Sequence, residues 1–204
     1  MFQAIKQYCD ALIKEFDTIS EERKTQLEKI SAYVSSKKES NSPIQLVYVC
    51  THNSRRSHFG QIWAQVAANY YNIKSVTTFS GGTEATAFNI NAINAIKRVG
   101  FDVHSIDMKA NATYHIFFDE TEKAIVCFSK VYDDSQNPKS NFAAIMTCSD
   151  AEENCPFLTG VELRIGTTYD DPKTFDNTHL QDVKYDERCK QIALESLYVF
   201  SQVK

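Results

Sequence analysis

The 204-residue chain lacks a long hydrophobic run. No apolar stretch approaches the roughly 18 residues that a membrane-spanning helix needs. The chain also lacks the marks of a secretory signal peptide, which are a basic region, a continuous apolar region and a small-residue cleavage site. Its start, MFQAIKQYCDALIKEFD, is instead amphipathic and carries acidic residues. We therefore expect a cytoplasmic protein with no membrane partner.

The chain also lacks an excess of positive charge, with 22 Lys and Arg against 26 Asp and Glu. The formal net charge is −4, and the isoelectric point is near 5.7. Non-specific nucleic-acid binding usually needs a basic face, so we expect no nucleic-acid partner. The acidic balance also means that an anionic ligand must be captured by a local site rather than by the field of the whole protein. With 43% hydrophobic residues and no low-complexity tract, the chain is long enough for one domain and an appendage.

Hydrophobic periodicity divides the chain into two parts. Residues 2–36 carry apolar side chains at helical spacing, with a break near residue 19, where Thr18 and Glu21 form a candidate capping box. A polar segment, KKESNSP at residues 37–43, predicts a linker. We therefore predict an N-terminal helical extension over 1–42 and a catalytic domain over 43–204.

The second part alternates between short β-branched runs and helical segments. This order is typical of a parallel sheet with helices on both faces. Residues 113–140 interrupt it with two β-rich runs around a charged turn, which predicts an inserted β-hairpin. The predicted fold is α/β, with a four-stranded parallel sheet and helices on both faces. The predicted strands are 44–50, 76–80, 143–147 and 161–165, and the predicted helices are 57–71, 89–99 and 182–203.

The segment CTHNSRRS, at residues 50–57, lies between the first predicted strand of the sheet and a helix. Ligands bind beyond the carboxyl ends of strands in open parallel sheets. Backbone N–H groups and the positive end of a helix dipole favour an oxyanion there, and they favour a thiolate on Cys50. Arg56, six residues after Cys50, offers a planar fork for two oxygens. The candidate oxyanion-binding residues are Thr51, His52, Asn53, Ser54, Arg55, Arg56 and Ser57.

A structural interpretation of this segment stays open. Cys50 can be a small buried residue at a strand end, followed by two surface arginines. The helix dipole argues against it, because two cations at a helix start are unfavourable unless an anion lies there.

The segment resembles the loop of the low-molecular-weight protein tyrosine phosphatases, Cys-x-x-Asn-x-x-Arg-Ser, at Cys50, Asn53, Arg56 and Ser57. The family usually has Gly in place of His52. Gly permits backbone angles that other residues resist, so this departure bears on the shape of the loop and on substrate access. The family also carries an Asp-Pro pair late in the chain. The resemblance implies that Asp171, before Pro172, is the general acid that protonates the leaving oxygen.

Two further cysteines follow the third predicted strand, in TCSDAEENCPF. Cys148 and Cys155 do not fit a zinc site, because the spacing is not Cys-x2-Cys and no matching His or Cys pair follows. SDAEEN reads as a short helix that ends before Pro156. Seven residues of helix span about 10.5 Å, whereas a disulfide needs Cα atoms within about 7 Å. The two cysteines therefore pair only if the helix unwinds.

This segment resembles the redox loop of the thioredoxin-coupled arsenate reductases, Cys-Ser-Asp-Ala-x-x-Asn-Cys-Pro. The resemblance covers about residues 44–110 and 141–176. It implies that Cys50 attacks arsenate with help from Asp171, that Cys148 then forms a disulfide with Cys50, and that Cys155 attacks Cys148. Thioredoxin would reduce the resulting Cys148–Cys155 disulfide, and no tightly bound cofactor is implied. Some relatives bind potassium near the loop, where Asn53 and Ser80 match loosely.

Two other functions stay open. In the first, the protein is a low-molecular-weight tyrosine phosphatase that hydrolyses phosphate monoesters through a phosphocysteine, and the extra cysteines only protect Cys50. In the second, it is a phospho-binding module without catalysis, which the intact Cys50, Arg56 and Asp171 disfavour. A structural interpretation of Cys148 and Cys155 also stays open, in which they are two thiols on a loop without a redox role. The remaining cysteines, Cys9, Cys127 and Cys189, are expected to be buried.

Overall fold

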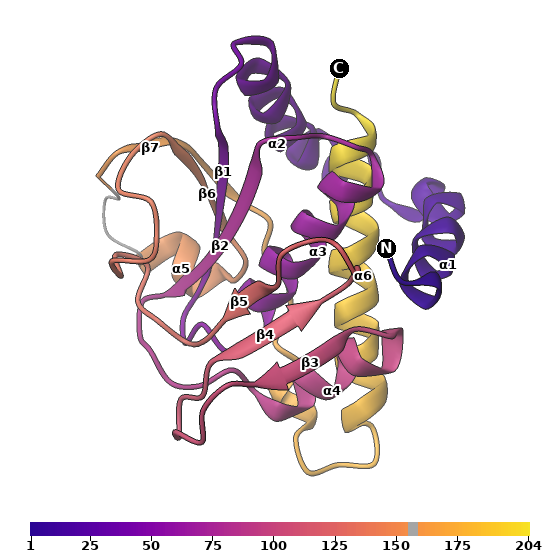
Figure 1. The fold of residues 1–204 in the computed structure, drawn as a ribbon, viewed down its shortest axis with the longest axis vertical. Helices are drawn as coiled ribbons and strands as arrows, with labels where there is room; N and C mark the ends of the chain where they lie inside the picture. Colours follow the sequence, from indigo (N-terminus) through magenta and orange to yellow (C-terminus); the bar gives the residue numbers. More distant parts are fainter. Residues whose placement is uncertain (155–158) are drawn as a thin grey trace.

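The computed structural model describes residues 1–154 and 159–204. Four parallel strands form the central sheet in the order β2-β1-β6-β7 (Figure 1). Their bounds are β1 Ile44–Cys50, β2 Val76–Gly82, β6 Phe142–Met146 and β7 Val161–Gly166. The predicted four-stranded parallel sheet is therefore confirmed.

Strand β1 lies inside the sheet and separates two hydrophobic clusters. Leu46 and Tyr48 belong to the larger cluster, and Val47 and Val49 belong to the smaller one. Successive side chains of a strand point to opposite faces, so a strand that is covered on both sides needs apolar residues throughout. This explains why IQLVYVC shows no alternation of polar and apolar residues.

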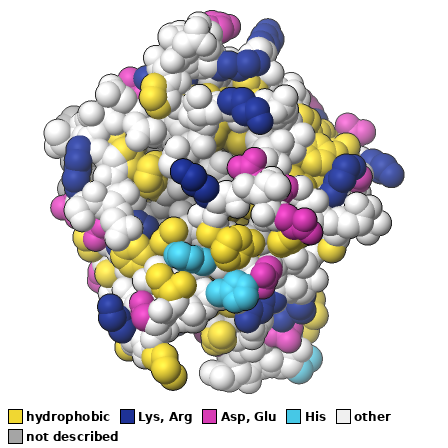
Figure 2. All heavy atoms as spheres, viewed as in Figure 1, with side chains coloured by type: hydrophobic (Ala, Val, Ile, Leu, Met, Phe, Trp, Pro, Cys, Tyr) yellow, Lys and Arg dark blue, Asp and Glu magenta, His cyan; other side chains and the backbone are white. Residues whose placement is uncertain are grey.

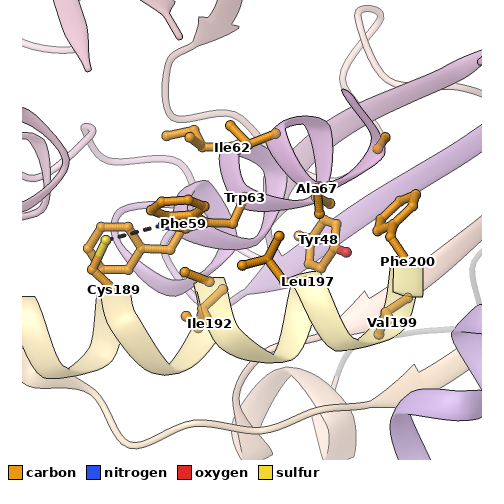
Figure 3. Close-up of a cluster of buried hydrophobic side chains, with 14 of the residues drawn as sticks. Tyr48, Phe59, Ile62, Trp63, Ala67, Cys189, Ile192, Leu197, Val199 and Phe200 are labelled. Carbon is orange, nitrogen blue, oxygen red and sulfur yellow. Dashed lines mark hydrogen bonds between the residues drawn. The ribbon is translucent and has the colours of Figure 1, made fainter. Parts of the chain in front are cut away.

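The larger cluster lies between the sheet and three helices, α3 Arg56–Tyr70, α4 Ile90–Val99 and α6 Gln181–Ser201. Figure 3 shows Phe59 and Trp63 of α3 against Ile192 and Leu197 of α6. The Trp63 indole donates a 3.2 Å hydrogen bond to the Cys189 sulfur. Full burial of each such apolar side chain contributes about 1.5–3 kcal/mol, so the contact between α3 and α6 fixes the helix that begins beside Cys50.

The smaller cluster includes Ala151 of the short helix α5, Ser149–Asn154. Helices therefore lie on both faces of the sheet, as predicted. Helix α4 ends at Gly100, which has a φ of 116° and closes the helix in the left-handed conformation. A 3-10 turn, η2 Pro172–Phe175, precedes α6.

The N-terminal segment forms α1 Gln3–Leu12, a 3-10 turn η1 Ile13–Thr18 and α2 Glu21–Glu39, all of which contact α6. The cap of α2 is Ser20, which accepts a 3.2 Å hydrogen bond from the Arg23 N–H, so the predicted Thr18–Glu21 box is wrong. The predicted linker is also wrong in part, because residues 37–39 are helical. Lys37 and Lys38 are stabilised at the negative end of the helix dipole.

The insert is an antiparallel sheet of three strands, β3 Asp102–Ser105, β4 Tyr114–Phe117 and β5 Ile125–Cys127. The predicted hairpin corresponds to β4 and β5, but β3 was not predicted and residues 128–140 lie outside the hairpin. The sequence of β3 gave no signal because most of its side chains are exposed and polar. After β5 the chain turns back, and Val131 forms a parallel bridge with Gly82 at the end of β2.

Throughout the described ranges, no helix has the length and apolar character needed to cross a bilayer. The boundary at residues 42 and 43 stays a prediction, since the buried side chains of α1 and α2 share the larger cluster with the sheet.

Candidate active site

The loop of residues 51–55 connects the carboxyl end of β1 to the first turn of α3. Strands β2 and β6 flank β1, so the loop lies in the middle of the sheet edge where open parallel sheets bind ligands. Helix α3 begins at Arg56 and has no acidic residue in its first turn. The positive end of its dipole is therefore not neutralised by its own side chains.

The Cys50 side chain is buried and lies next to a hydroxyl group. Its Sγ atom is 3.1 Å from Ser57 Oγ. Ser57 Oγ also accepts a 2.8 Å hydrogen bond from the Asn53 side-chain amide. Because that lone pair is occupied by a donor, the Ser57 hydroxyl hydrogen is free to point at the sulfur. The arrangement suits a thiolate at Cys50.

Asn53 holds the shape of the loop. Its φ is 44°, in the left-handed region that Asn tolerates better than most residues. Its side-chain oxygen accepts a 2.9 Å hydrogen bond from the Lys130 N–H, which ties the loop to the segment after β5. His52 is not among the residues with positive φ, and its carbonyl accepts from Ser129 and Thr86 hydroxyls. His52 therefore stands in place of the usual Gly without backbone strain.

The backbone of the loop is available to an anion. Within the part of the chain that the structure describes, the N–H groups of residues 51–55 donate to no other group. The end of β2 supports the loop from below, since the Glu84 N–H donates 2.8 Å to the Thr51 carbonyl and the Thr83 N–H donates 3.2 Å to the Cys50 carbonyl. A cradle of backbone donors beside a helix start is the usual place for a phosphate-like group.

Arg56 lies between the loop and Asp171. One terminal nitrogen donates a 2.6 Å hydrogen bond to Asp171 Oδ2, and the other donates 2.8 Å to the Tyr169 carbonyl. The third nitrogen, Nε, is buried and has no partner among the residues that the structure describes. A buried unpaired donor is costly, and an oxyanion in the cradle would satisfy it. Asp171 also caps η2, accepting a 3.0 Å hydrogen bond from the Lys173 N–H.

Arg55 is directed toward the segment after β7 rather than toward the cradle. Its Nε donates 2.7 Å to the Tyr185 hydroxyl, and a terminal nitrogen is 3.3 Å from Asp176 Oδ2. Its Nε also lies 3.9 Å from Asp171 Oδ1. The prediction that Arg55 binds the anion is untested. Ser54 likewise donates its hydroxyl to the Ala87 carbonyl, at 2.7 Å.

Cys148 lies two residues after the end of β6, beside the loop of residues 51–55. Its Sγ is 3.5 Å from the Thr51 hydroxyl and accepts from the Ala151 N–H at 3.4 Å. The Thr51 hydroxyl in turn donates 2.7 Å to Asp150, in the first turn of α5. The fold therefore brings the second predicted redox cysteine next to the residue that follows Cys50. Cys155 lies outside the described residues.

The other three cysteines are buried, as predicted. Cys9, Cys127 and Cys189 are at most 1% exposed, and burial raises the pKa of each thiol to about 12. Such thiols stay protonated near neutral pH and are poor nucleophiles.

The two candidate potassium ligands make other contacts. Asn53 bonds to Ser57 and to the Lys130 N–H, and Ser80 donates 2.6 Å to Gln61 Oε1. The Lys130 side chain, which follows this N–H, is itself 5% exposed, and burial lowers the pKa of its ammonium group. Over residues 1–154 and 159–204, no group of three or more His, Cys, Asp or Glu is placed to hold a metal. The potassium site stays a prediction.

Charged side chains of both signs are interspersed over the face in Figure 2, without a continuous basic patch. The strand register pairs His104 with His115 across β3 and β4. An anion would therefore have to be bound by the loop itself rather than by a basic surface on this face.

Sequence reasoning missed three residues around the site: Asp176, Tyr185 and Lys130. Asp176 lies shortly after Asp171 in the chain, and that proximity was a usable signal. Tyr185 and Lys130 gave none, because each reaches the site only through long-range packing of α6 or of the segment after β5.

No protein-family model matches the chain. The chain is 30% identical over 128 residues to an arsenate reductase of Staphylococcus aureus (strain Newman), covering 62% of this chain and 77% of the relative. It is 28% identical over 128 residues to arsenate reductase 2 of Staphylococcus haemolyticus, with the same coverage. Among solved structures, an arsenate reductase in a phosphate-binding state covers 79% of this chain and 99% of its own, at 15% identity and a TM-score of 0.51.

A YwlE mutant from Bacillus subtilis covers 78% of this chain and 97% of its own, at 12% identity and a TM-score of 0.51. These likenesses show the fold alone, and it is the fold that the resemblance to the low-molecular-weight phosphatases implies, with a four-stranded parallel sheet between helices. The similarity to the curated sequences shows the family: the chain belongs to the arsenate reductase family.

Proposed function

We propose that this protein reduces arsenate to arsenite, with Cys50 as the nucleophile and Cys148 and Cys155 as a relay to a thioredoxin-type reductant. The observation that carries the proposal is the place of Cys148, whose sulfur lies 3.5 Å from the hydroxyl of Thr51, directly after Cys50. A phosphatase needs one cysteine at the cradle, whereas a reductase that ends in a disulfide needs a second one within reach.

The first step begins with arsenate in the loop of residues 51–57. The Cys50 thiolate forms a bond to arsenic, and an oxygen leaves as water after taking a proton from Asp171. Arg56 and the backbone N–H groups stabilise the charge on the remaining oxygens. Asp171 suits this role because it already contacts Arg56 at 2.6 Å and therefore lies at the edge of the cradle.

The second step transfers electrons. The Cys148 thiolate attacks the Cys50 sulfur, the sulfur–arsenic bond breaks, and its electron pair stays on arsenic, which leaves as arsenite. The Cys155 thiolate then attacks Cys148, which releases Cys50 as a thiolate and leaves a Cys148–Cys155 disulfide. A thioredoxin dithiol reduces that disulfide through a mixed disulfide. Residues 43–204 are proposed as the catalytic domain and 1–42 as an extension of it.

The test compares the parent protein with Cys148→Ser in two assays. One follows arsenate reduction with thioredoxin, thioredoxin reductase and NADPH, and the other follows hydrolysis of p-nitrophenyl phosphate. The variant should lose multiple-turnover arsenate reduction, because the adduct on Cys50 cannot be resolved. It should keep most of its phosphate-ester hydrolysis, which needs only Cys50, Arg56 and Asp171.

Cys9→Ala is the matched control, since Cys9 is a buried thiol of α1 outside the site and its loss should leave both assays unchanged. Sustained arsenate turnover by Cys148→Ser would overturn the relay. If Cys50→Ser keeps either activity, Cys50 is not the nucleophile.

The second candidate is a phosphatase of phosphate monoesters. It is favoured by the contact between Asp171 and Arg56, because this fold's hydrolytic chemistry needs an acid at the edge of the cradle. A parent protein that hydrolyses the aryl phosphate but does not turn over arsenate with thioredoxin would establish this candidate instead.

A further inference from the structure

Two consecutive arginines contact the same carboxylate from different directions. Arg56 reaches Asp171 Oδ2 at 2.6 Å, and Arg55 lies 3.9 Å from Asp171 Oδ1. Both arginine side chains are about one-tenth exposed, so these charges lie in a partly desolvated place where electrostatic interactions are strong. The contact at Arg55 has no role in the chemistry proposed for the loop.

Arg55 is fixed by a polar cluster that leaves it little freedom. The Tyr185 hydroxyl accepts from Arg55 Nε at 2.7 Å and donates to Asp176 Oδ1 at 2.7 Å. Asp176 Oδ2 is 3.3 Å from a terminal nitrogen of Arg55, and the Asn91 amide donates 3.4 Å to Asp176 Oδ1. Burial, with Asp176 second, raises the pKa of Tyr185 to about 12, so the phenol keeps its proton at neutral pH.

Anion binding requires Arg56 to change its contacts, whereas Arg55 can keep the contacts it has. An oxyanion in the cradle needs the planar fork of Arg56, and the nitrogen that now bonds Asp171 is part of that fork. This nitrogen carries two N–H groups, so when the anion takes one of them, Asp171 is held by the other alone and its bond to Arg56 is weakened. Arg55 does not have to move, because Tyr185 and Asp176 anchor it outside the cradle.

We propose that Arg55 is a positioning residue that keeps the Asp171 carboxyl docked over the cradle after Arg56 has turned to the anion. Arg55 acts on the segment at two points, through Asp171 itself and through Asp176 at the end of η2. One guanidinium therefore bonds Asp176 at one end of the turn and attracts Asp171 electrostatically, at 3.9 Å, at the other end. This inference rests on the proposed role of Asp171 as the general acid.

The test uses Arg55→Met and a series of aryl phosphates whose leaving groups differ in acidity. If the general acid is no longer positioned, hydrolysis should slow most for esters whose leaving groups are weak acids, because these leaving groups need a proton to depart. We expect kcat/KM for phenyl phosphate to fall about tenfold or more, with a fall of less than about threefold for 2,4-dinitrophenyl phosphate. The Kd of inorganic phosphate should change little, because Arg56 still binds it.

Three further variants keep the test sharp. Arg55→Lys should restore part of the phenyl phosphate activity, and Tyr185→Phe should show the same dependence on the leaving group more weakly, with less risk to folding. Arg98→Met is the matched control, because Arg98 pairs with Asp182 and Asp186 at the surface of α6, away from the cradle. It should leave the whole series unchanged.

An equal fall for every ester in both Arg55→Met and Tyr185→Phe would overturn the proposal, since it would indicate a structural role. A large loss of phosphate affinity would overturn it as well, because Arg55 would then bind the anion. Asp171→Asn distinguishes the positioning role of Arg55 from the proposed role of Asp171 as the general acid. If the activity of Asp171→Asn does not depend on the leaving group, or if the parent hydrolyses none of the esters, Asp171 is not the general acid and both roles are refuted. If the activity depends on the leaving group in Asp171→Asn but not in Arg55→Met, only the positioning role of Arg55 is refuted.

Discussion

Gly82 offers the sharpest test of how tightly the cradle is packed. It is the last residue of β2 and lies directly opposite Cys50 in the strand register. A Cβ atom at this position would lie 2.6 Å from the Thr51 carbonyl oxygen and 2.7 Å from the Asn53 nitrogen, and it would also clash with the Glu84 carbonyl oxygen. All three are backbone atoms, so no rotation of a side chain relieves the contact.

The expected effect of Gly82→Ala follows from these distances. Real Cβ contacts essentially never fall below 3.0 Å, so Thr51 and Asn53 must retreat by a few tenths of an ångström. Catalytic groups have to be held within about 0.5 Å of their productive geometry, and a displacement near 1 Å costs about 10²-fold in rate. Since the shift is a few tenths of that distance, we expect p-nitrophenyl phosphate hydrolysis to fall roughly 3- to 10-fold, and the free energy of unfolding to fall by about 1–3 kcal/mol.

Gly81→Ala is the matched control for this prediction. Its Cβ would point to the opposite side of the strand and lie 2.6 Å from the Tyr132 Cα, so the steric conflict is similar but falls outside the cradle. Guanidinium chloride unfolding should show a comparable loss of stability in both variants, while hydrolysis should fall much less in Gly81→Ala. Equal activity losses in the two variants, or full activity in Gly82→Ala, would refute the reasoning.

Two further predictions concern stability. Arg23→Met removes the cation from the 2.8 Å pair with Glu195, whose carboxylate is 5% exposed and also accepts from Tyr169, so we expect a loss of about 3–5 kcal/mol in denaturant unfolding; a loss below about 1 kcal/mol would contradict this account of the pair. Burial raises the pKa of Cys189 to about 12 from an ordinary value of 9.0, so its stabilising contribution is complete below pH 9 and is lost as the pH rises toward 12. Stability should therefore fall by about 1 kcal/mol more per pH unit in the parent than in Cys189→Ala over that range, and parallel curves would exclude this contribution.

Helix α2 of the N-terminal extension is linked through α6 to Tyr169, which lies two residues before Asp171. Arg23 of α2 pairs with Glu195 of α6, and Glu195 accepts a 2.7 Å hydrogen bond from the Tyr169 hydroxyl. The carbonyl of Tyr169 in turn accepts from Arg56. The N-terminal helices are thus packed against the residues that support the cradle, although their sequence carries no motif that indicates it.

The sequence by itself determined the cradle and most of the sheet. The strand, the loop and the helix start are contiguous over residues 44–57, so the position of Cys50 at a strand end and of Arg56 at a helix start follows from local periodicity alone. The same is true of Gly100, whose place at the end of α4 requires only local backbone geometry. The strand β3 escaped this reasoning because an exposed, polar strand carries no hydrophobic pattern.

Only the tertiary structure decided which side chains meet. Asp171 and Arg56 are 115 residues apart in the chain, and Thr51 and Cys148 are 97 apart. Sequence spacing cannot predict that Arg55 bonds Tyr185 while its neighbour Arg56 bonds Asp171. Polar partners of this kind are selected when packed helices and strands bring distant loops together, because a buried charge must find its partner in whatever the fold places beside it.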